Sequence, residues 1–291
     1  MVRPGVSELE VFVATSSFQT FVVGADQPVG QFLCRNLQNQ GLVYKSISLE
    51  NREKLPTMSG GRPFFVIIPS SRADDLGHAL YWLERAQELD ATVLLLSSLA
   101  LFSYRAERQV DEECDDFADT EEAALLQHLE QATRQNERHV ILRAGQLISL
   151  QGDDFANAVL AAAREQKSVS LDMQRLFDPT MADDIADVLL AIIRQLVCSD
   201  DLFGTYHCSG SEPVSAFSFA EALLAQVGQY EDLTELELGS EEGAMMPDVW
   251  AVSSDNTLLF HTFGVQQKAW RQGLSRLLQR YYRVDDGASS R

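Results

Sequence analysis

The sequence has little positive charge. Its 291 residues include 23 Lys and Arg against 43 Asp and Glu, which gives a formal net charge of −20 at pH 7. A surface of this sign repels phosphate, and this excludes a general nucleic-acid-binding protein. The acidity suits solubility, and it also suits binding to a basic protein partner. Both interpretations stay open from composition alone.

Cysteine is scarce and long apolar runs are missing. The four cysteines form no CxxC pair, and the five histidines have no metal-ligand spacing, so we expect reduced thiols and no metal site. The longest apolar stretch, residues 188–197, is too short to span a membrane and contains Arg194 and Gln195. Glu8 and Glu10 stand where a secretory signal would be apolar. We therefore expect a cytoplasmic protein without a membrane segment.

What the sequence has is a regular alternation of short apolar strands and longer helical segments. Strands are predicted at 18–23, 43–49, 64–68, 92–96, 140–142 and 204–209, with a weaker one at 9–14 and a short one at 233–238. Helices are predicted at 29–40, 74–89, 120–135, 153–165, 183–196, 219–227 and 268–282. This alternation predicts an α/β fold with a doubly wound parallel sheet.

The rhythm of strands and helices changes after Gly145, which predicts a second, smaller part of the molecule. We divide the chain into an N-terminal extension or added strand, a Rossmann-like core, a mixed segment that returns to the core and forms a substrate-type lobe, and a flexible tail. These segments are 1–17, 18–150, 151–284 and 285–291.

The stretch Phe21–Gly30 is the most informative part of the chain. It predicts a buried strand, a glycine turn and a helix start, which is the phosphate-binding corner of a dinucleotide-binding βαβ unit. Gly24 permits the tight turn, and Gly30 permits close packing of the helix on the strand. The middle glycine of the usual G-x-x-G-x-x-G spacing is replaced by Gln27, and Pro28 removes one backbone N–H.

Five stretches in order resemble the extended short-chain dehydrogenase/reductases, most closely the dTDP-4-dehydrorhamnose reductase (RmlD-like) group. Residues 24–30 resemble its T-G-A-x-G-Q-L-G turn, and residues 96–102 resemble its S-T-D-Y-V-F strand end. The other matches are 141–145 with I-L-R-T-S, 178–186 with P-T-x-x-x-D-L-A, and 204–210 with G-x-Y-H-x-x-G, followed by Phe219-Ala220. The resemblance covers about residues 18–280.

The resemblance implies a Rossmann-like fold with a C-terminal substrate-type lobe, an NAD or NADP cofactor and a nucleotide-linked sugar as substrate. By the same resemblance, Ser98 is placed to polarise a substrate carbonyl. The residues that it assigns to cofactor binding are Gly24, Ala25, Gln27, Gly30, Ser97 and Ser98. Either Ser48 or Glu50 follows the second strand where the ribose anchor belongs, so the choice between NAD and NADP stays open.

The residues at the expected catalytic positions differ from those of that family. Its reductases use a Tyr-x-x-x-Lys pair on one helix, and the family pattern places Glu122 and Leu126 at these two positions. No lysine occurs between Lys54 and Lys167, so this loss does not depend on the alignment. Tyr104 is a nearby tyrosine, but it falls in a predicted loop. The acidic run at 111–122 would also oppose phosphate-bearing ligands.

We therefore expect an RmlD-like protein that lacks the catalytic pair and acts in binding or regulation. One alternative is an NAD(P)-dependent reductase or epimerase of a nucleotide-linked sugar, and a second is a nucleotide or dinucleotide sensor. The partners that suit these hypotheses are another protein, a second copy of this chain, or a nucleotide sugar. Fold resemblance alone does not decide between them.

Overall fold

The computed structural model describes most of the chain. The described residues are 19–52, 55, 62–70, 73–103, 109–152, 154–165, 168–199, 201–233, 235–241, 244–245 and 254–288. The strand predicted at 9–14, the extension at 1–17 and Tyr104 lie outside them.

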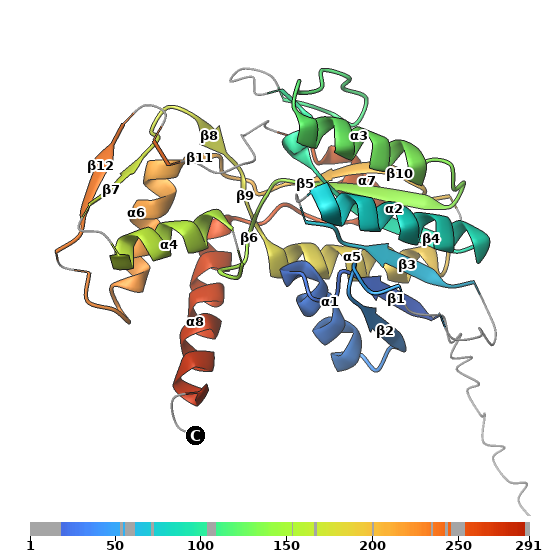
Figure 1. Cartoon of the computed structure of the whole chain (residues 1–291), viewed down its shortest axis with the longest axis horizontal. Helices are drawn as coiled ribbons and strands as arrows, with labels where there is room; N and C mark the ends of the chain where they lie inside the picture. Colours follow the sequence, from blue (N-terminus) through green and yellow to red (C-terminus); the bar gives the residue numbers. More distant parts are fainter. Residues whose placement is uncertain are drawn as a thin grey trace, which may run out of the picture.

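A six-stranded parallel sheet forms the larger half of the molecule (Figure 1). Its strand order is β10-β5-β4-β3-β1-β2. The strands are β1 (Thr20–Val23), β2 (Tyr44–Ile47), β3 (Phe64–Ile67), β4 (Thr92–Ser98), β5 (His139–Ala144) and β10 (Gly204–Cys208). β1 pairs with β2 on one side and β3 on the other, so the strand order reverses at β1. In such sheets, ligands bind outside the carboxyl ends of the strands at this point.

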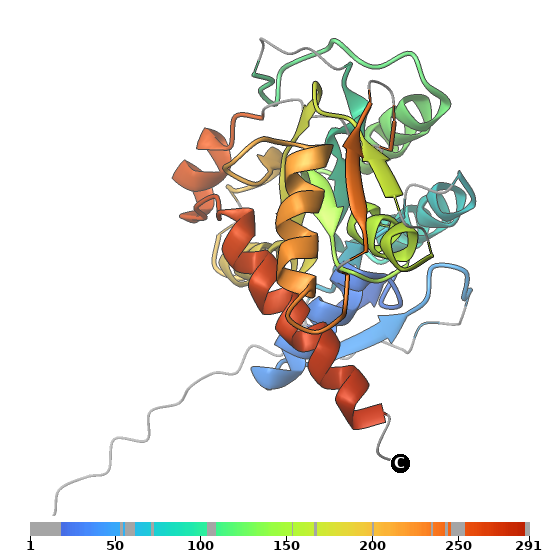
Figure 2. The same ribbon diagram turned by 90° about the vertical axis from the view of Figure 1, so that its left-hand side faces the viewer.

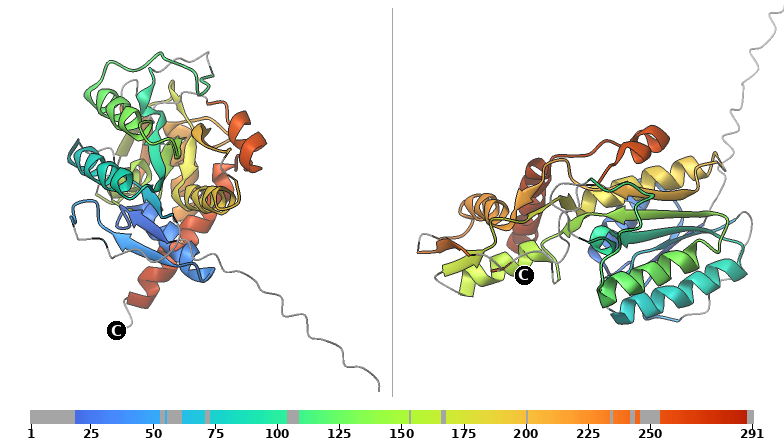
Figure 3. Two further views of the ribbon diagram at one scale, coloured as in Figure 1. Left: turned by 90° about the vertical axis from the view of Figure 1, so that its right-hand side faces the viewer. Right: turned by 90° about the horizontal axis from the view of Figure 1, so that it is seen from above.

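Helices cover both faces of the sheet, as Figure 3 shows from above. Along β1, Phe21 and Val23 belong to one apolar cluster, and Val22 belongs to the other. This alternation follows from the two-residue period of a strand, and both clusters are buried, which explains the continuous apolar sequence. One face packs against α1 (Pro28–Asn39) and α5 (Ala182–Leu196), and the other packs against α2 (Ala73–Glu88) and α3 (Glu121–Thr133).

A smaller lobe stands beside the carboxyl ends of the sheet (Figures 1 and 2). Its helices are α4 (Phe155–Glu165), α6 (Ala216–Val227) and α8 (Trp270–Ala288). Its paired strands are β7 (Ser168–Leu171) with β12 (Glu237–Ser240), and β8 (Leu176–Phe177) with β11 (Val214–Ser215). Between the lobe and the sheet, β6 (Gln146–Ile148) pairs with β9 (Pro179–Met181).

Aromatic rings hold the smaller lobe together, and ion pairs join its last helix to α5. The rings of Phe155, Phe177 and Phe219 contact one another at centroid distances of 5.4–5.8 Å, and Trp270 contacts Phe219 at 5.2 Å. These contacts join α4, α6 and the start of α8 around one apolar centre. At the start of α5, the carboxylate of Asp183 binds Arg276 and Arg280 of α8. The last long helix is therefore fixed to the helix that covers the sheet.

The sequence-based prediction of the C-terminal region needs three corrections. The strand expected at 233–238 is β12 at Glu237–Ser240, because it is defined by pairing with distant β7 and not by its own apolar pattern. α8 continues to Ala288, so its last residues fall in the segment from Asp285 for which we expected a flexible tail. The helix α7 (Thr257–Phe263) was not predicted; it ends at Gly264, whose φ is 69°. Short segments like these depend on tertiary contacts more than on local pattern.

Candidate functional site

A cavity of about 490 Å³ opens at the carboxyl ends of the central strands. Its walls come from the β1–α1 turn, the ends of β2, β3, β4 and β5, the first two turns of α3, and the segment that leads into α4. This is the position at which the reversal of strand order predicts ligand binding. We call this cavity the switch-point cleft.

Two glycines shape the β1–α1 turn below the cleft. Gly24 has a φ of +84°, and a Cβ there would lie 2.1 Å from the backbone oxygen of Ile68. A Cβ on Gly30 would lie 2.1 Å from the oxygen of Gly24. Both positions therefore require glycine, the first for its dihedral angles and a close approach, the second for the approach alone.

The predicted cofactor residues divide into two groups. Gln27, Ser97 and Ser98 line the switch-point cleft. Gly24, Ala25 and Gly30 do not line it, but they build the turn that supports Gln27. Of the two candidates for a ribose anchor, Glu50 lines the cleft and Ser48 does not.

Glu122 and Leu126 both line the cleft, one helical turn apart on α3. α3 begins where Thr120 accepts a hydrogen bond from the N–H of Ala123, which fixes the direction of this wall. Leu126 is 3% exposed and packs among apolar residues. At the end of β4, Ser98 Oγ accepts a hydrogen bond from the N–H of Ala100 at 3.1 Å. No tyrosine or lysine is among the described residues that line the cleft.

A buried ion pair lies behind this wall, which the sequence reasoning missed. Arg143 on β5 makes two hydrogen bonds of 2.9 and 2.7 Å to the carboxylate of Glu130 on α3. Ser97 Oγ donates to the same carboxylate at 2.7 Å, and Arg134 also donates to it. Burial raises the pKa of Glu130, but the hydrogen bonds and charge of Arg143 outweigh it and hold this pKa below its usual range.

The ion pair extends to β10 and to the acidic loop. Arg143 Nη1 donates to Nε2 of His207 at 3.2 Å, and the His207 backbone N–H donates to Glu112 Oε1 at 3.0 Å. His207 is fully buried. Burial, with the nearby charge of Arg143, lowers the pKa of His207 to about 4. The ring is therefore neutral near pH 7 and accepts from Arg143. We call Ser97, Glu112, Glu130, Arg143 and His207 the buried polar network.

The charge of the cleft lining is of one sign. Five carboxylates line it and, among the described residues, no Lys, Arg or His does. They come from five separate segments and are Asp26, Glu50, Asp75, Glu122 and Asp154. Only Glu122 belongs to the acidic run recognised in the sequence. Asp26 and Glu50 each follow a predicted strand, Asp75 lies in the first turn of α2, and Asp154 directly precedes α4. Positions after strands and at helix starts are the signal that could have placed these residues at this edge.

The lining does not fit the pyrophosphate of an NAD(P) cofactor. At the turn, the N–H of Gln27 donates to the oxygen of Gly24, and those of Gly24 and Ala25 donate to Ile47. Pro28, the first residue of α1, has no N–H. Backbone donors at a helix start are what normally holds phosphate, and here they are reduced while carboxylates surround them.

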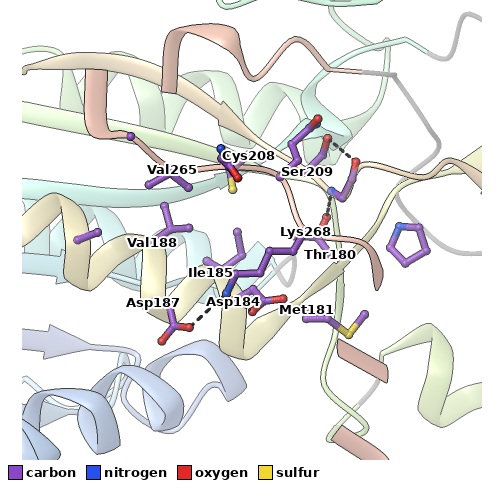
Figure 4. Close-up of a pocket in the computed structure, with 16 residues that line it drawn as sticks. Thr180, Met181, Asp184, Ile185, Asp187, Val188, Cys208, Ser209, Val265 and Lys268 are labelled. Carbon is purple, nitrogen blue, oxygen red and sulfur yellow. Dashed lines mark hydrogen bonds and ion pairs between the residues drawn. The ribbon is translucent and has the colours of Figure 1, made fainter. Parts of the chain in front are cut away.

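A second cavity of about 410 Å³ lies between α5, the end of β10 and residues 264–268 (Figure 4). Ile185, Val188 and Val265 form an apolar wall. Lys268 Nζ binds Asp184 at 2.6 Å and Asp187 at 3.5 Å. Burial lowers the pKa of Lys268, but its bond to Asp184 outweighs this and raises the pKa above its usual value. In this second cavity, Lys268 therefore pairs with both acidic side chains.

Other site types find no support in the described part of the chain. No group of three or more His, Cys, Asp or Glu is arranged to hold a metal ion among these residues. The four cysteines are free. No described helix is both long enough and apolar enough to cross a membrane.

Comparison with known proteins identifies relatives. A family model described as the RmlD substrate binding domain matches residues 83–283. The dTDP-4-dehydrorhamnose reductase of Sinorhizobium fredii is 28% identical over 151 residues, which are 49% of this chain and 50% of that protein. That of Aggregatibacter actinomycetemcomitans is 23% identical over 146 residues, 48% of this chain and 50% of its own. These matches span about half the length of the two curated relatives.

Solved structures match over most of the chain. A dTDP-4-dehydrorhamnose reductase from Clostridium acetobutylicum has a TM-score of 0.74 at 15% identity, covering 91% of this chain and 100% of its own. One from Bacillus anthracis, in complex with NADP, has a TM-score of 0.72 at 18% identity and covers 91% of this chain and 98% of its own. At these identities the likeness concerns the fold. The Rossmann-like doubly wound sheet expected from sequence is confirmed, as is the resemblance to the RmlD-like group.

Proposed function

Since the chain belongs to the RmlD substrate binding domain family, we propose that it is a member that binds a small ligand in the switch-point cleft without reducing it. In this proposal it serves as a binding or regulatory protein. The observation that carries the proposal is the pair of side chains, Glu122 and Leu126, on the cleft wall formed by α3.

The chemistry of these two side chains supports the proposal. A short-chain reductase needs a group that donates a proton to the carbonyl oxygen while a nicotinamide supplies hydride. A tyrosine does this with a lysine one helical turn away, because the ammonium lowers the tyrosine pKa. Leu126 carries no charge for that task, and a carboxylate at position 122 faces a cleft that already holds four others.

Ser98 supports a second candidate function. It lines the cleft at the end of β4, where a reductase of this superfamily would polarise a substrate carbonyl. The curated relatives carry the name dTDP-4-dehydrorhamnose reductase. The alternative is therefore an NAD(P)-dependent reductase or epimerase of a nucleotide-linked sugar that uses a different proton donor. A nucleotide or dinucleotide sensor without turnover is the third hypothesis.

The decisive test is a turnover assay with the full chain. Oxidation of NADPH and of NADH is followed at 340 nm with a dTDP-4-keto-6-deoxy sugar as substrate, beside a Ser98→Ala variant. We expect no turnover above the variant's background. Steady turnover that Ser98→Ala removes would establish the reductase and overturn the proposal.

A binding assay separates the remaining hypotheses. A ligand at 100 times its dissociation constant stabilises the folded state by about 2.7 kcal/mol, which a thermal melt detects. We expect no shift with NADH or NADPH, whereas a dinucleotide sensor would show one. Analytical ultracentrifugation of the purified chain, alone and with a candidate partner, then tests binding to a second copy or to another protein.

A further inference from the structure

The charge of this chain is distributed unevenly along the sequence. Residues 111–130 contain nine Asp and Glu and no Lys or Arg, whereas residues 256–284 contain no Asp or Glu and five Lys and Arg. The first segment includes most of α3, and the second includes α7, the residues after it and most of α8. Seen from above, α3 and α7 lie on opposite sides of the central sheet (Figure 3). The long acidic run is therefore on the side of the sheet that α7 does not occupy.

The carboxylates on the α7 side are paired with cations. At the start of α5, Asp184 binds Lys268 and Arg276, and Asp187 binds Lys268. A chain with a formal net charge of −20 repels its own copies, and this repulsion is weakest where the charges of a surface are balanced. Two copies therefore approach each other most easily through the side that carries α5 and α7.

Apolar side chains are exposed on the same side. On α7, Leu258 and Phe260 are 45% and 42% exposed. The helix itself is fixed, because Leu259 and Phe263 are buried and the backbone oxygen of Phe263 accepts a hydrogen bond from Gln195 of α5 at 2.9 Å. An apolar ring that is already held by a fixed helix loses little conformational freedom when a partner covers it.

The second cavity follows α7 directly in the chain. Gly264, which ends α7, lines the cavity together with Val265, and Ile185 and Val188 of α5 line it as well (Figure 4). A cavity of about 150 Å³ with apolar walls holds a benzene ring. The second cavity has about 410 Å³, so it has room for the ring of a phenylalanine. One surface thus carries both a projecting apolar ring and an apolar hollow.

Such a surface is complementary to itself under a two-fold axis, because each copy offers the projection that the other copy receives. We propose that a second copy of this chain docks on the surface formed by α7, residues 264–268 and the side of α5 that lines the second cavity. In this dimer, Phe260 of each copy enters the second cavity of the other. The interface is separate from the switch-point cleft and does not depend on what the cleft binds.

Sedimentation velocity of the full chain over a range of concentrations tests the proposal. We expect an equilibrium between monomer and dimer that shifts toward the dimer as NaCl is raised, because salt screens the repulsion between two acidic chains. A monomer at every concentration would overturn the proposal. A dimer that dissociates as NaCl is raised would also contradict it, since ion pairs and not apolar contacts would then hold the copies together.

Two truncations of exposed apolar side chains locate the interface. Phe260→Ala removes the projecting ring and should raise the dissociation constant of the dimer at least about tenfold. Leu176→Ala in β8 is the matched control, because Leu176 is 43% exposed and does not line the second cavity, and it should leave the constant unchanged. Circular dichroism checks that both variants are folded. Equal effects of the two truncations, or no effect of the first, would place the interface elsewhere.

A mixture of two variants tests the two-fold arrangement. Val265→Trp fills the cavity and keeps Phe260, whereas Phe260→Ala keeps the cavity open, so each variant alone loses both contacts of the dimer. In the mixture one native contact returns, and the other sets a small side chain against a filled cavity. We expect the mixture to associate at concentrations at which neither variant does. A mixture of folded variants that stays monomeric would show that Phe260 does not enter the cavity.

This inference and the proposed function fail in different experiments. Reduction of a keto sugar by NADPH contradicts the non-reductive function, whatever the oligomeric state. A chain that stays monomeric without any turnover contradicts the docking surface and leaves the non-reductive function standing.

Discussion

The two walls of the switch-point cleft are held in different ways. The β1–α1 wall depends on backbone geometry, because Gly24 and Gly30 leave no room for a Cβ. The α3–β5 wall depends on side chains, through the ion pair of Glu130 and Arg143 behind it. The β1–α1 wall therefore requires glycine at both of these positions. The second can change its cleft-facing residues, such as Glu122 and Leu126, while the buried polar network keeps it in place.

The largest expected effect comes from breaking the buried polar network. Arg143→Met leaves Glu130 buried without its main cation, and removal of one partner from such a pair costs about 3–5 kcal/mol. Urea unfolding followed by circular dichroism measures this loss. As a control, the exposed pair of Arg62 and Asp90 is broken by Arg62→Gln. An Arg143→Met protein as stable as the wild type would show that the second wall does not need this pair.

The glycine wall is tested with two substitutions inside helices. Gly30→Ala forces a Cβ to within 2.1 Å of backbone, and we expect a loss of about 3 kcal/mol. Gly77→Ala on α2 meets nothing within 4 Å, so this control should stabilise the protein by about 0.5–1 kcal/mol. Shifts of the urea midpoint in opposite directions are the expected result. Parallel shifts would mean that close approach does not distinguish the two positions.

The pH dependence of stability reports on His207. The pKa of His207 in the folded protein is about 4, below the ordinary 6.5. Its contribution to the free energy of unfolding is therefore fully present above pH 6.5 and is lost as the pH falls toward 4. We expect His207→Gln to reduce this loss by about 2 kcal/mol. Burial raises the pKa of Asp178 to about 6 and acts in the opposite direction, but equally in both proteins. Identical pH profiles between pH 7 and 4 would contradict the role of His207.

The smallest expected effect is at the surface. Arg62 binds Asp90 at 2.9 Å, but both side chains are exposed, so Arg62→Gln should lower the urea midpoint far less than Arg143→Met does. The cost should shrink further in 0.5 M NaCl, because salt screens exposed charges. A loss similar to that of Arg143→Met would remove the distinction between a buried network and surface ion pairs.

Local sequence predicted the first half of the fold well. The strands at 64–68 and 92–96 became β3 and β4 nearly unchanged, because both are buried on two faces and have continuous apolar sequence. The paired segments of the smaller lobe were harder. β7 and β12 lie nearly seventy residues apart in the chain and are strands because they pair with each other.

The candidate site was only partly predictable for the same reason. Glycine spacing identified Gly24 and Gly30, and the family pattern placed Glu122 and Leu126 on the wall of the cleft. The ion pair of Glu130 with Arg143 left no local signal, since its members come from a helix and from the strand that follows it, and each residue type is common on a surface.

The sequence by itself determined the alternation of strands and helices, the glycine turn and the lack of any lysine between Lys54 and Lys167, because these depend on neighbouring residues or on a residue type that is missing. The tertiary structure decided which charges meet. Five carboxylates from five separate segments gather around one cleft, since parallel strands bring their carboxyl ends to the same edge of the sheet.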